Sequence, residues 1–171
     1  MKNTKLITML CLGALIACSP SKKGLEPTSE QVSPRERLIE NLRATPQKGI
    51  MFGHHDDTVY GIGWEFDEGG SDVQKVCGDY PAVISFDLGE IELGGDKSLD
   101  KVPFEKIRKE IINQYNRGGL VSLSWHPRNP KTGGDAWDVS DHAVVKSILP
   151  EGENYEKFQS WLGKVNDFIL S

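Results

Sequence analysis

Short, mostly apolar runs alternate with segments of helical periodicity along most of the chain. Three such runs, residues 49–53, 82–86 and 120–124, each end abruptly in polar residues. Apolar runs of this length are typical of parallel strands that are buried on both faces. The segment 103–115 has large apolar side chains at helical spacing, and Gly118 follows it as a stop signal. The pattern therefore predicts an α/β fold with about three βα units.

A short helix is predicted before the first run, because Ser33, Pro34 and Glu36 form a capping box. Right-handed crossovers would then place the later helices on one side of a curling parallel sheet. A closed barrel of eight βα units needs about 250 residues. We therefore expect residues 33–171 to form part of a (β/α)8 TIM barrel, about three βα units preceded by a short N-terminal helix.

The first 17 residues have the pattern of a secretory signal peptide. Lys2 and Lys5 precede an uncharged stretch, residues 6–17, that is too short to span a bilayer as a mature helix. Its end resembles the bacterial lipobox, in which Cys18 is lipidated and becomes the mature N-terminus; an ordinary signal peptide with an incidental cysteine is the alternative. Residues 18–32 are poor in apolar side chains and predict a flexible tether.

Localisation follows from these features as an expectation. Ser19, rather than an aspartate, follows Cys18, which by resemblance to lipoprotein sorting rules favours the outer membrane. The membrane is thus an expected partner through the lipid on Cys18, with the periplasmic or cell-surface face left open.

Composition excludes several other partners. The net charge of −5 is spread without a basic patch, so nucleic acid is not expected to bind. With Cys11 in the signal peptide and Cys18 lipidated, Cys77 is alone and is predicted to be a small core residue. The chain has no phosphate-binding loop and no paired CxxC motif, so no cofactor is expected.

Side chains suited to chemistry follow each apolar run. His54 and His55 follow the first run, Asp87 the second, and Trp125 with His126 the third. The carboxyl ends of parallel strands share one rim, so these side chains are expected to meet there. Imidazole and carboxylate groups bind sugar hydroxyls, and an indole face stacks on a pyranose ring.

Loop residues extend this candidate sugar site. Asn129 follows the third run closely, and its amide suits hydroxyl groups. Trp64 and Trp137 lie in loops on the same side, where each is either a lid anchor or a sugar platform. We include Asn129 and Trp64 among the candidate substrate-binding residues.

Other interpretations of the same residues remain open. The polar cluster at 54–57 could simply hydrogen-bond at a strand end. A metal-dependent hydrolase is a further alternative, because His54 or His55 with Asp87 and His126 suit zinc or manganese.

Glu90 and Glu92 are the only glutamates close after a strand end, and they do not suit glycoside cleavage. A retaining enzyme needs two carboxyl groups about 5–5.5 Å apart on different elements across the substrate. Positions i and i+2 of one loop do not meet this requirement, so neither residue is assigned a catalytic role.

Several of these segments resemble glycoside hydrolase family 26. The resemblance runs from about residue 50 to the C-terminus and is carried by the following segments in order: residues 53–58, 60–61, 64, 71–73, 78–83, 86–89, 118–119, 124–126, 129–130 and 148–150. It implies a (β/α)8 barrel and an endo-β-1,4-mannanase that cleaves mannan with retention through two glutamates.

The resemblance also implies roles for individual residues. Trp125 and His126 would lie near the sugar adjoining the cleaved bond, and His54, His55 and Asp87 on the pocket floor. The catalytic glutamates of the family follow strands four and seven, so we expect them beyond Ser171 and assign no catalytic residue here.

Two functional expectations follow. The first is a β-mannanase-type glycosidase acting on β-mannan or a related polysaccharide, represented by its N-terminal portion. The second is an inactive or weakly sugar-binding remnant, whose open sheet edges and uncovered inner face would favour self-association of the half-barrel.

Overall fold

The computed structural model describes residues 32–171, and the predicted signal peptide and nearly all of the tether lie outside this part. The chain divides into two units at Arg43 and Ala44. Helix α1 (Pro34–Ala44) makes up most of the described part of the first unit. The predicted capping box is confirmed: the Ser33 amide donates to Glu36 over 2.8 Å, and the Glu36 amide donates to the Ser33 hydroxyl over 3.2 Å.

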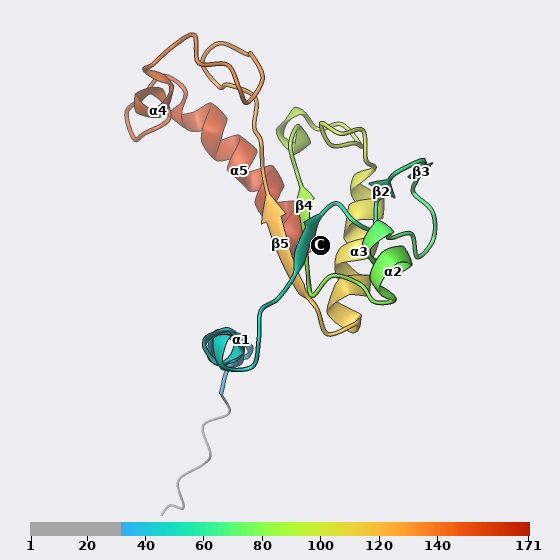
Figure 1. Ribbon diagram of the computed structural model, residues 1–171. Helices are drawn as coiled ribbons and strands as arrows, with labels where there is room; N and C mark the ends of the chain where they lie inside the picture. Colours follow the sequence, from blue (N-terminus) through green and yellow to red (C-terminus); the bar gives the residue numbers. More distant parts are fainter. Residues whose placement is uncertain (1–31) are drawn as a thin grey trace, which may run out of the picture. The chain divides into compact units, whose positions relative to one another are not determined.

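The second unit is built on a three-stranded parallel sheet (Figure 1). Its strands are β1 (Gly53–His55), β4 (Val83–Asp87) and β5 (Leu120–Ser124), in the order β1-β4-β5. A separate antiparallel pair, β2 (Tyr60–Gly61) and β3 (Trp64–Glu65), forms a small hairpin. The three predicted parallel strands are therefore confirmed.

The first strand is shorter and later than its apolar run predicts. The run covers residues 49–53, but β1 begins only at Gly53, and Ile50 and Phe52 are exposed. In the described sheet β1 lies at an edge and pairs with β4 through three residues, and the preceding run adds the bond from the Val83 amide to the Phe52 carbonyl over 3.2 Å.

The connections between the strands carry the helices. Helix α2 (Asp72–Cys77) separates β1 from β4, and α3 (Phe104–Asn116) separates β4 from β5. The remaining helical elements are η1 (Thr45–Gln47), η2 (Ile91–Leu93), α4 (Val144–Ser147) and α5 (Tyr155–Leu170).

Helix α3 matches the clearest predicted helix. Helix α4 is only four residues long, and the segment before it is held in turns because Asp138 and Asp141 accept bonds from the amides of Ser140 and Ala143.

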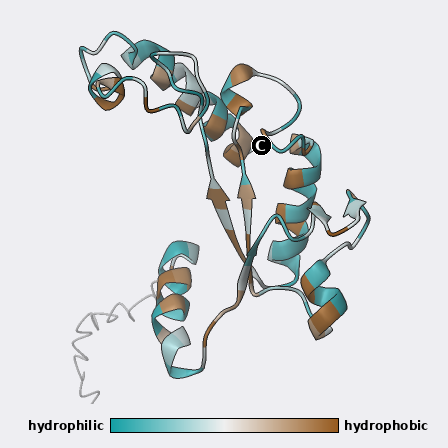
Figure 2. Ribbon diagram, turned by 45° about the horizontal axis from the view of Figure 1, so that its top comes forward, coloured by the Kyte–Doolittle hydropathy of each residue, from teal (hydrophilic) through white to brown (hydrophobic). Residues whose placement is uncertain are grey.

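The core lies between the sheet, α3 and α5. Its fully buried centre includes Ile84 and Phe86 of β4 and Ile107 of α3, and Phe168 of α5 joins it. Figure 2 shows apolar residues within the strands of the sheet. The prediction that Cys77 is a core residue is wrong: its side chain is exposed at the end of a six-residue helix with no buried residue.

The pleat of the sheet separates two sets of side chains. Residues 84 and 86 point to the helix core, so 85 and 87 point to the opposite face. The register pairs His55 with Ser85 and Asp87 with Ser124. His55, Asp87 and Ser124 therefore share the face away from the core, whereas His54, paired with Ile84, does not.

No helix within residues 32–171 is long and apolar enough to cross a membrane.

Candidate functional site

The end of β4 and the residues after β5 meet around one carboxylate. Asp87 is 2% exposed and accepts three hydrogen bonds. Its Oδ2 accepts from the Ser124 hydroxyl over 2.8 Å and from Nδ1 of His126, and its Oδ1 accepts from the Gly89 amide over 2.5 Å. Two of the predicted site residues are thus directly bonded.

These bonds set the ionisation of Asp87 and the tautomer of His126. Burial alone raises the pKa of Asp87, but the bonds from Gly89, His126 and Ser124 outweigh it and hold that pKa below its ordinary value. The carboxylate can only accept, so Nδ1 of His126 carries the hydrogen. In the neutral ring this leaves Nε2 as a free acceptor on a side chain that is 46% exposed.

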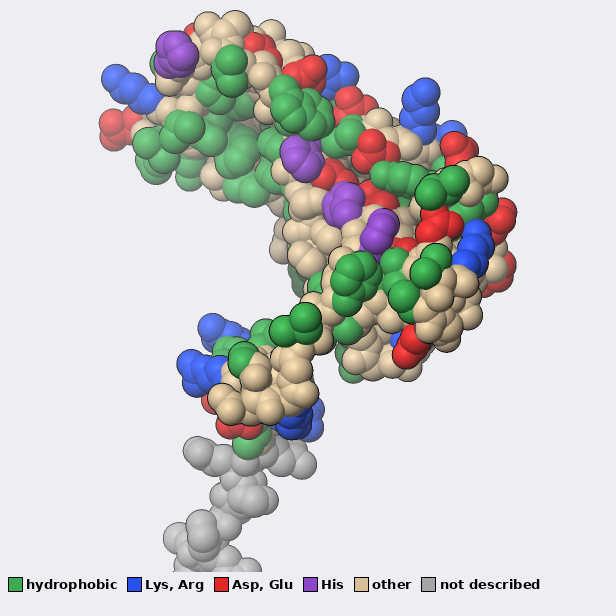
Figure 3. Space-filling view, viewed as in Figure 1, with side chains coloured by type: hydrophobic (Ala, Val, Ile, Leu, Met, Phe, Trp, Pro, Cys, Tyr) green, Lys and Arg blue, Asp and Glu red, His purple; other side chains and the backbone are tan. Residues whose placement is uncertain are grey.

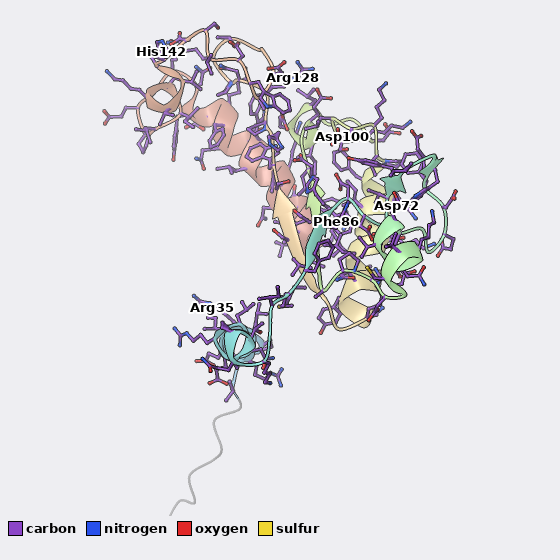
Figure 4. The ribbon with its side chains drawn as sticks, in the orientation of Figure 1. Arg35, Asp72, Phe86, Asp100, Arg128 and His142 are labelled. Carbon is purple, nitrogen blue, oxygen red and sulfur yellow. The ribbon has the colours of Figure 1, made fainter. Side chains whose placement is uncertain are left out.

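Trp137 covers one face of this imidazole. The two rings are stacked with centroids 5.4 Å apart and planes 11° apart, and Trp137 is 65% exposed. Figure 3 shows histidine side chains in a row beside acidic side chains on one face of the unit. His126 lines a pocket of about 400 Å³ together with residues that include Arg128 and Asp138. Arg128 lies on the loop after β5 (Figure 4).

Trp125 is held by the protein on two sides. Its Nε1 donates to Oε2 of Glu92 over 2.9 Å, and its ring stacks on Phe158 of α5 with centroids 5.8 Å apart. Glu92 is 2% exposed, and its Oε1 accepts from the Arg128 amide over 2.7 Å. On the same loop as Glu92, Oε1 of Glu90 lies 2.8 Å from Nη2 of Arg128.

The polar cluster at the end of β1 divides into two pairs. Nε2 of His55 lies 3.1 Å from Oδ2 of Asp56, which also accepts from the Tyr60 hydroxyl over 3.4 Å. Nδ1 of His54 lies 2.8 Å from the His55 carbonyl and 3.9 Å from Asp57.

The two aspartates of this cluster have different surroundings. Asp57 accepts from the Ser71 hydroxyl and the Val73 amide, which ties β1 to the start of α2. Burial raises the pKa of Asp56 to about 6; His55 opposes the shift, and the charges of Asp100 and Asp87 add to it. Among the described residues, Oδ1 of Asp56 has no hydrogen-bond partner.

The comparisons with known proteins place these residues in a family. The sequence profile of glycosyl hydrolase family 26 matches residues 27–170. The chain belongs to this family.

Individual relatives support this membership. Mannan endo-1,4-beta-mannosidase of Bifidobacterium adolescentis is 30% identical over 132 residues, which cover 75% of this chain and 13% of that protein. A family 26 β-mannanase structure from Bacteroides ovatus is 63% identical with a TM-score of 0.77, over 78% of this chain and 39% of that chain. A modular endo-β-1,4-mannanase structure from Cellulomonas fimi is 27% identical with a TM-score of 0.59, over 71% and 28%.

This family 26 chain thus spans well under half the length of the relatives that it matches. The predicted family and the predicted fold, a partial (β/α)8 barrel, are confirmed. The roles of individual residues stay predictions.

Two predicted site residues use their polar groups in hydrogen bonds within the protein. Trp64 is 9% exposed, and its Nε1 donates to Asp72 over 2.7 Å. Asn129 lines the pocket, but its Oδ1 accepts from the amides of Lys131 and Thr132, and its Nδ2 donates to a backbone carbonyl. These bonds anchor the surrounding backbone, and the role of both residues as sugar contacts stays a prediction.

The metal alternative has no geometric support in the described part of this family 26 chain. Within residues 32–171, no group of three or more His, Cys, Asp or Glu side chains is arranged to hold a metal ion. Asp87 and His126 instead bond to each other.

The contacts of Ser124, Glu92 and Arg128 at this site were not indicated by the sequence pattern. Ser124 had a usable signal, because it ends β5 and pairs in register with Asp87, whose face of the sheet it therefore shares. Glu92 had none, because its partner Trp125 is 33 residues away along the chain.

Proposed function

We propose that this chain is part of a β-mannanase that hydrolyses β-1,4-mannosidic bonds with retention, and that its second unit supplies one wall of the substrate cleft. The observation that carries the proposal is the imidazole of His126, fixed by Asp87 and stacked on Trp137 beside a pocket. It occurs in a family 26 chain that is 63% identical to a β-mannanase structure.

The wall has the chemistry that a neutral polysaccharide needs. The free Nε2 of His126 accepts a bond from a sugar hydroxyl, and the exposed Trp137 indole offers an aromatic face to pyranose C–H groups. Arg128 adds donors at the pocket edge. None of these contacts requires a charged substrate.

Cleavage with retention requires two further carboxyl groups about 5–5.5 Å apart, one as nucleophile and one as acid and base. Glu90 and Glu92 are already bound to Arg128 and Trp125. We therefore propose that residues following Ser171 supply both catalytic glutamates, at the ends of the fourth and seventh strands.

The test is to extend the reading frame beyond codon 171 and to compare the longer product with the 171-residue chain. We expect the longer product to release mannooligosaccharides from β-1,4-mannan, and the 171-residue chain to bind mannohexaose without cleaving it. Cleavage by the 171-residue chain alone would refute the location of the glutamates. Cleavage of another β-glycan but not of mannan by the longer product would refute the substrate.

A second candidate is sugar binding without catalysis. It is favoured by the same engagement of Glu90 and Glu92, and by β1 and β5 standing at the two edges of the described sheet. Unpaired edges attract other strands, so this candidate predicts self-association. Sedimentation of the 171-residue chain as a monomer with a cooperative melting transition would count against it.

We also propose that Cys18, which lies outside the described residues, anchors the protein to the outer membrane through a lipid. Replacement Cys18→Ser is expected to abolish incorporation of radiolabelled palmitate and to release the protein from the membrane fraction. Retention of the label in that variant would refute the anchor.

A further inference from the structure

We propose that Glu90 and Glu92 form a carboxylate clamp that positions the wall residues 125–128, and that they are positioning residues rather than catalytic ones. The inference rests on the proposed function, since the wall is the part that would meet the polysaccharide. The clamp consists of an inner arm, Glu92, and an outer arm, Glu90.

The inner arm uses both oxygens of a buried carboxylate. Glu92 is 2% exposed, and its two oxygens accept from Nε1 of Trp125 over 2.9 Å and from the Arg128 amide over 2.7 Å. One side chain thus holds both ends of the segment 125–128. A buried carboxylate that gives up either donor is left poorly satisfied, so the two bonds resist displacement of this segment.

Helix α5 contacts both Glu92 and its partner Trp125. Nζ of Lys164 donates to the backbone carbonyl of Glu92 over 2.5 Å, and Phe158 stacks on the Trp125 ring. The indole of Trp125 is therefore fixed at its edge by Glu92 and at one face by Phe158. Rotation of this indole requires both contacts to break.

The outer arm acts on a side chain of the pocket. Oε1 of Glu90 lies 2.8 Å from Nη2 of Arg128, and each of the two side chains is about one third exposed. Glu90 has a left-handed backbone with φ of 69°, a conformation that side-chain-bearing residues rarely adopt. This bend begins η2, and both carboxylates of the loop reach the same segment from it.

The outer arm has a chemical consequence for the ligand. It compensates the charge of Arg128 while leaving other guanidinium N–H groups free to donate. A neutral polysaccharide gains from oriented donors, whereas an acidic one would also require an unpaired positive charge. The clamp therefore suits an uncharged mannan and disfavours an acidic glycan.

The experiment compares three variants of the 171-residue chain: Glu92→Gln, Glu90→Gln and the control Glu110→Gln. Glu110 is also buried, at 1% exposure, but it pairs with Lys106 on α3. Two readouts are used: hydrogen exchange of the Trp125 indole N–H by NMR, and mannohexaose affinity by calorimetry.

For Glu92→Gln we expect exchange of the Trp125 indole to rise and affinity to fall, each by roughly tenfold, because one charged acceptor is lost. For Glu90→Gln we expect weaker affinity with unchanged indole exchange. The control should leave both readouts at wild-type values. Unchanged indole exchange in Glu92→Gln, or equal effects of Glu92→Gln and the control, would overturn the clamp.

Failure of the proposed function gives a different pattern. If the wild-type chain does not bind mannohexaose, the function is wrong, while indole exchange still decides on the inner arm. If Glu92→Gln does not fold, the outer arm provides the test. The Arg128 side-chain N–H signal is then expected to shift in Glu90→Gln and not in the control. The absence of that shift in Glu90→Gln would overturn the proposal.

Discussion

The buried carboxyl of Asp56 leads to a prediction about how stability depends on pH. Asp56 is 2% exposed, and its pKa is raised from 3.8 to about 6, chiefly by burial. The folded protein therefore binds this proton more tightly than the unfolded chain does. Linkage then requires stability to fall as the pH rises from about 4 to about 6. Replacement Asp56→Asn removes this proton equilibrium.

The magnitude follows from the size of the shift. A change of one pKa unit corresponds to about 1.4 kcal/mol, so the shift at Asp56 amounts to about 3 kcal/mol. We subtract the free energy of unfolding of the wild type from that of Asp56→Asn at each pH. This difference should rise by up to about 3 kcal/mol between pH 4 and pH 7. Titrating groups that do not interact with Asp56 cancel in this difference.

The assay is urea denaturation of both proteins at several pH values from about 2 to about 8. Asp72→Asn is a suitable control with the opposite sign. The amide of Ile62 and Nε1 of Trp64 lower the pKa of Asp72, so its stabilisation is present above the unfolded pKa and is lost as the pH falls.

A parallel course of the Asp56→Asn and wild-type profiles would refute the reasoning. So would a difference that shrinks as the pH rises, because that sign belongs to a carboxyl whose folded pKa is lowered.

Four further predictions concern the wall and the core. Asp87→Asn should weaken mannohexaose binding roughly tenfold, measured by calorimetry, because His126 loses its charged acceptor. The same variant should lose the acid-side fall of unfolding free energy that a lowered carboxyl pKa produces, measured by denaturation below pH 5. Trp137→Ala should cost about 1 kcal/mol of binding with an unchanged melting temperature, because this exposed ring stacks only on His126 in the described contacts. Phe86→Ala should lower the free energy of unfolding by about 3–5 kcal/mol in urea denaturation, because Phe86 is fully buried in the core.

Much of the fold was predictable because hydrophobic period and strand direction follow from local sequence. The runs around β4 and β5 and the helix α3 were located correctly. The start of β1 was not, because the position of a strand within its sheet decides which residues pair. Cys77 was misplaced because a six-residue helix has too few turns for its pattern to identify a buried face.

The candidate site was predictable only where strand geometry determines it. Alternation along parallel strands is enough to bring Asp87 and His126 to one rim. It does not reveal what a loop side chain bonds to. The hydrogen-bond partners of Trp64, Asn129 and Glu92 depend on the path of each loop, so these partners could not be predicted from the sequence.

The clamp joins two stretches of chain that are more than thirty residues apart. Any recombination of this barrel with a relative must therefore transfer residues 88–93 together with 125–128. If residues 125–128 alone were replaced by those of a relative, the new side chains would face Glu90 and Glu92, which are positioned for Trp125 and Arg128. Exchanging sugar preference among such proteins is thus a matter of moving both loops as one module.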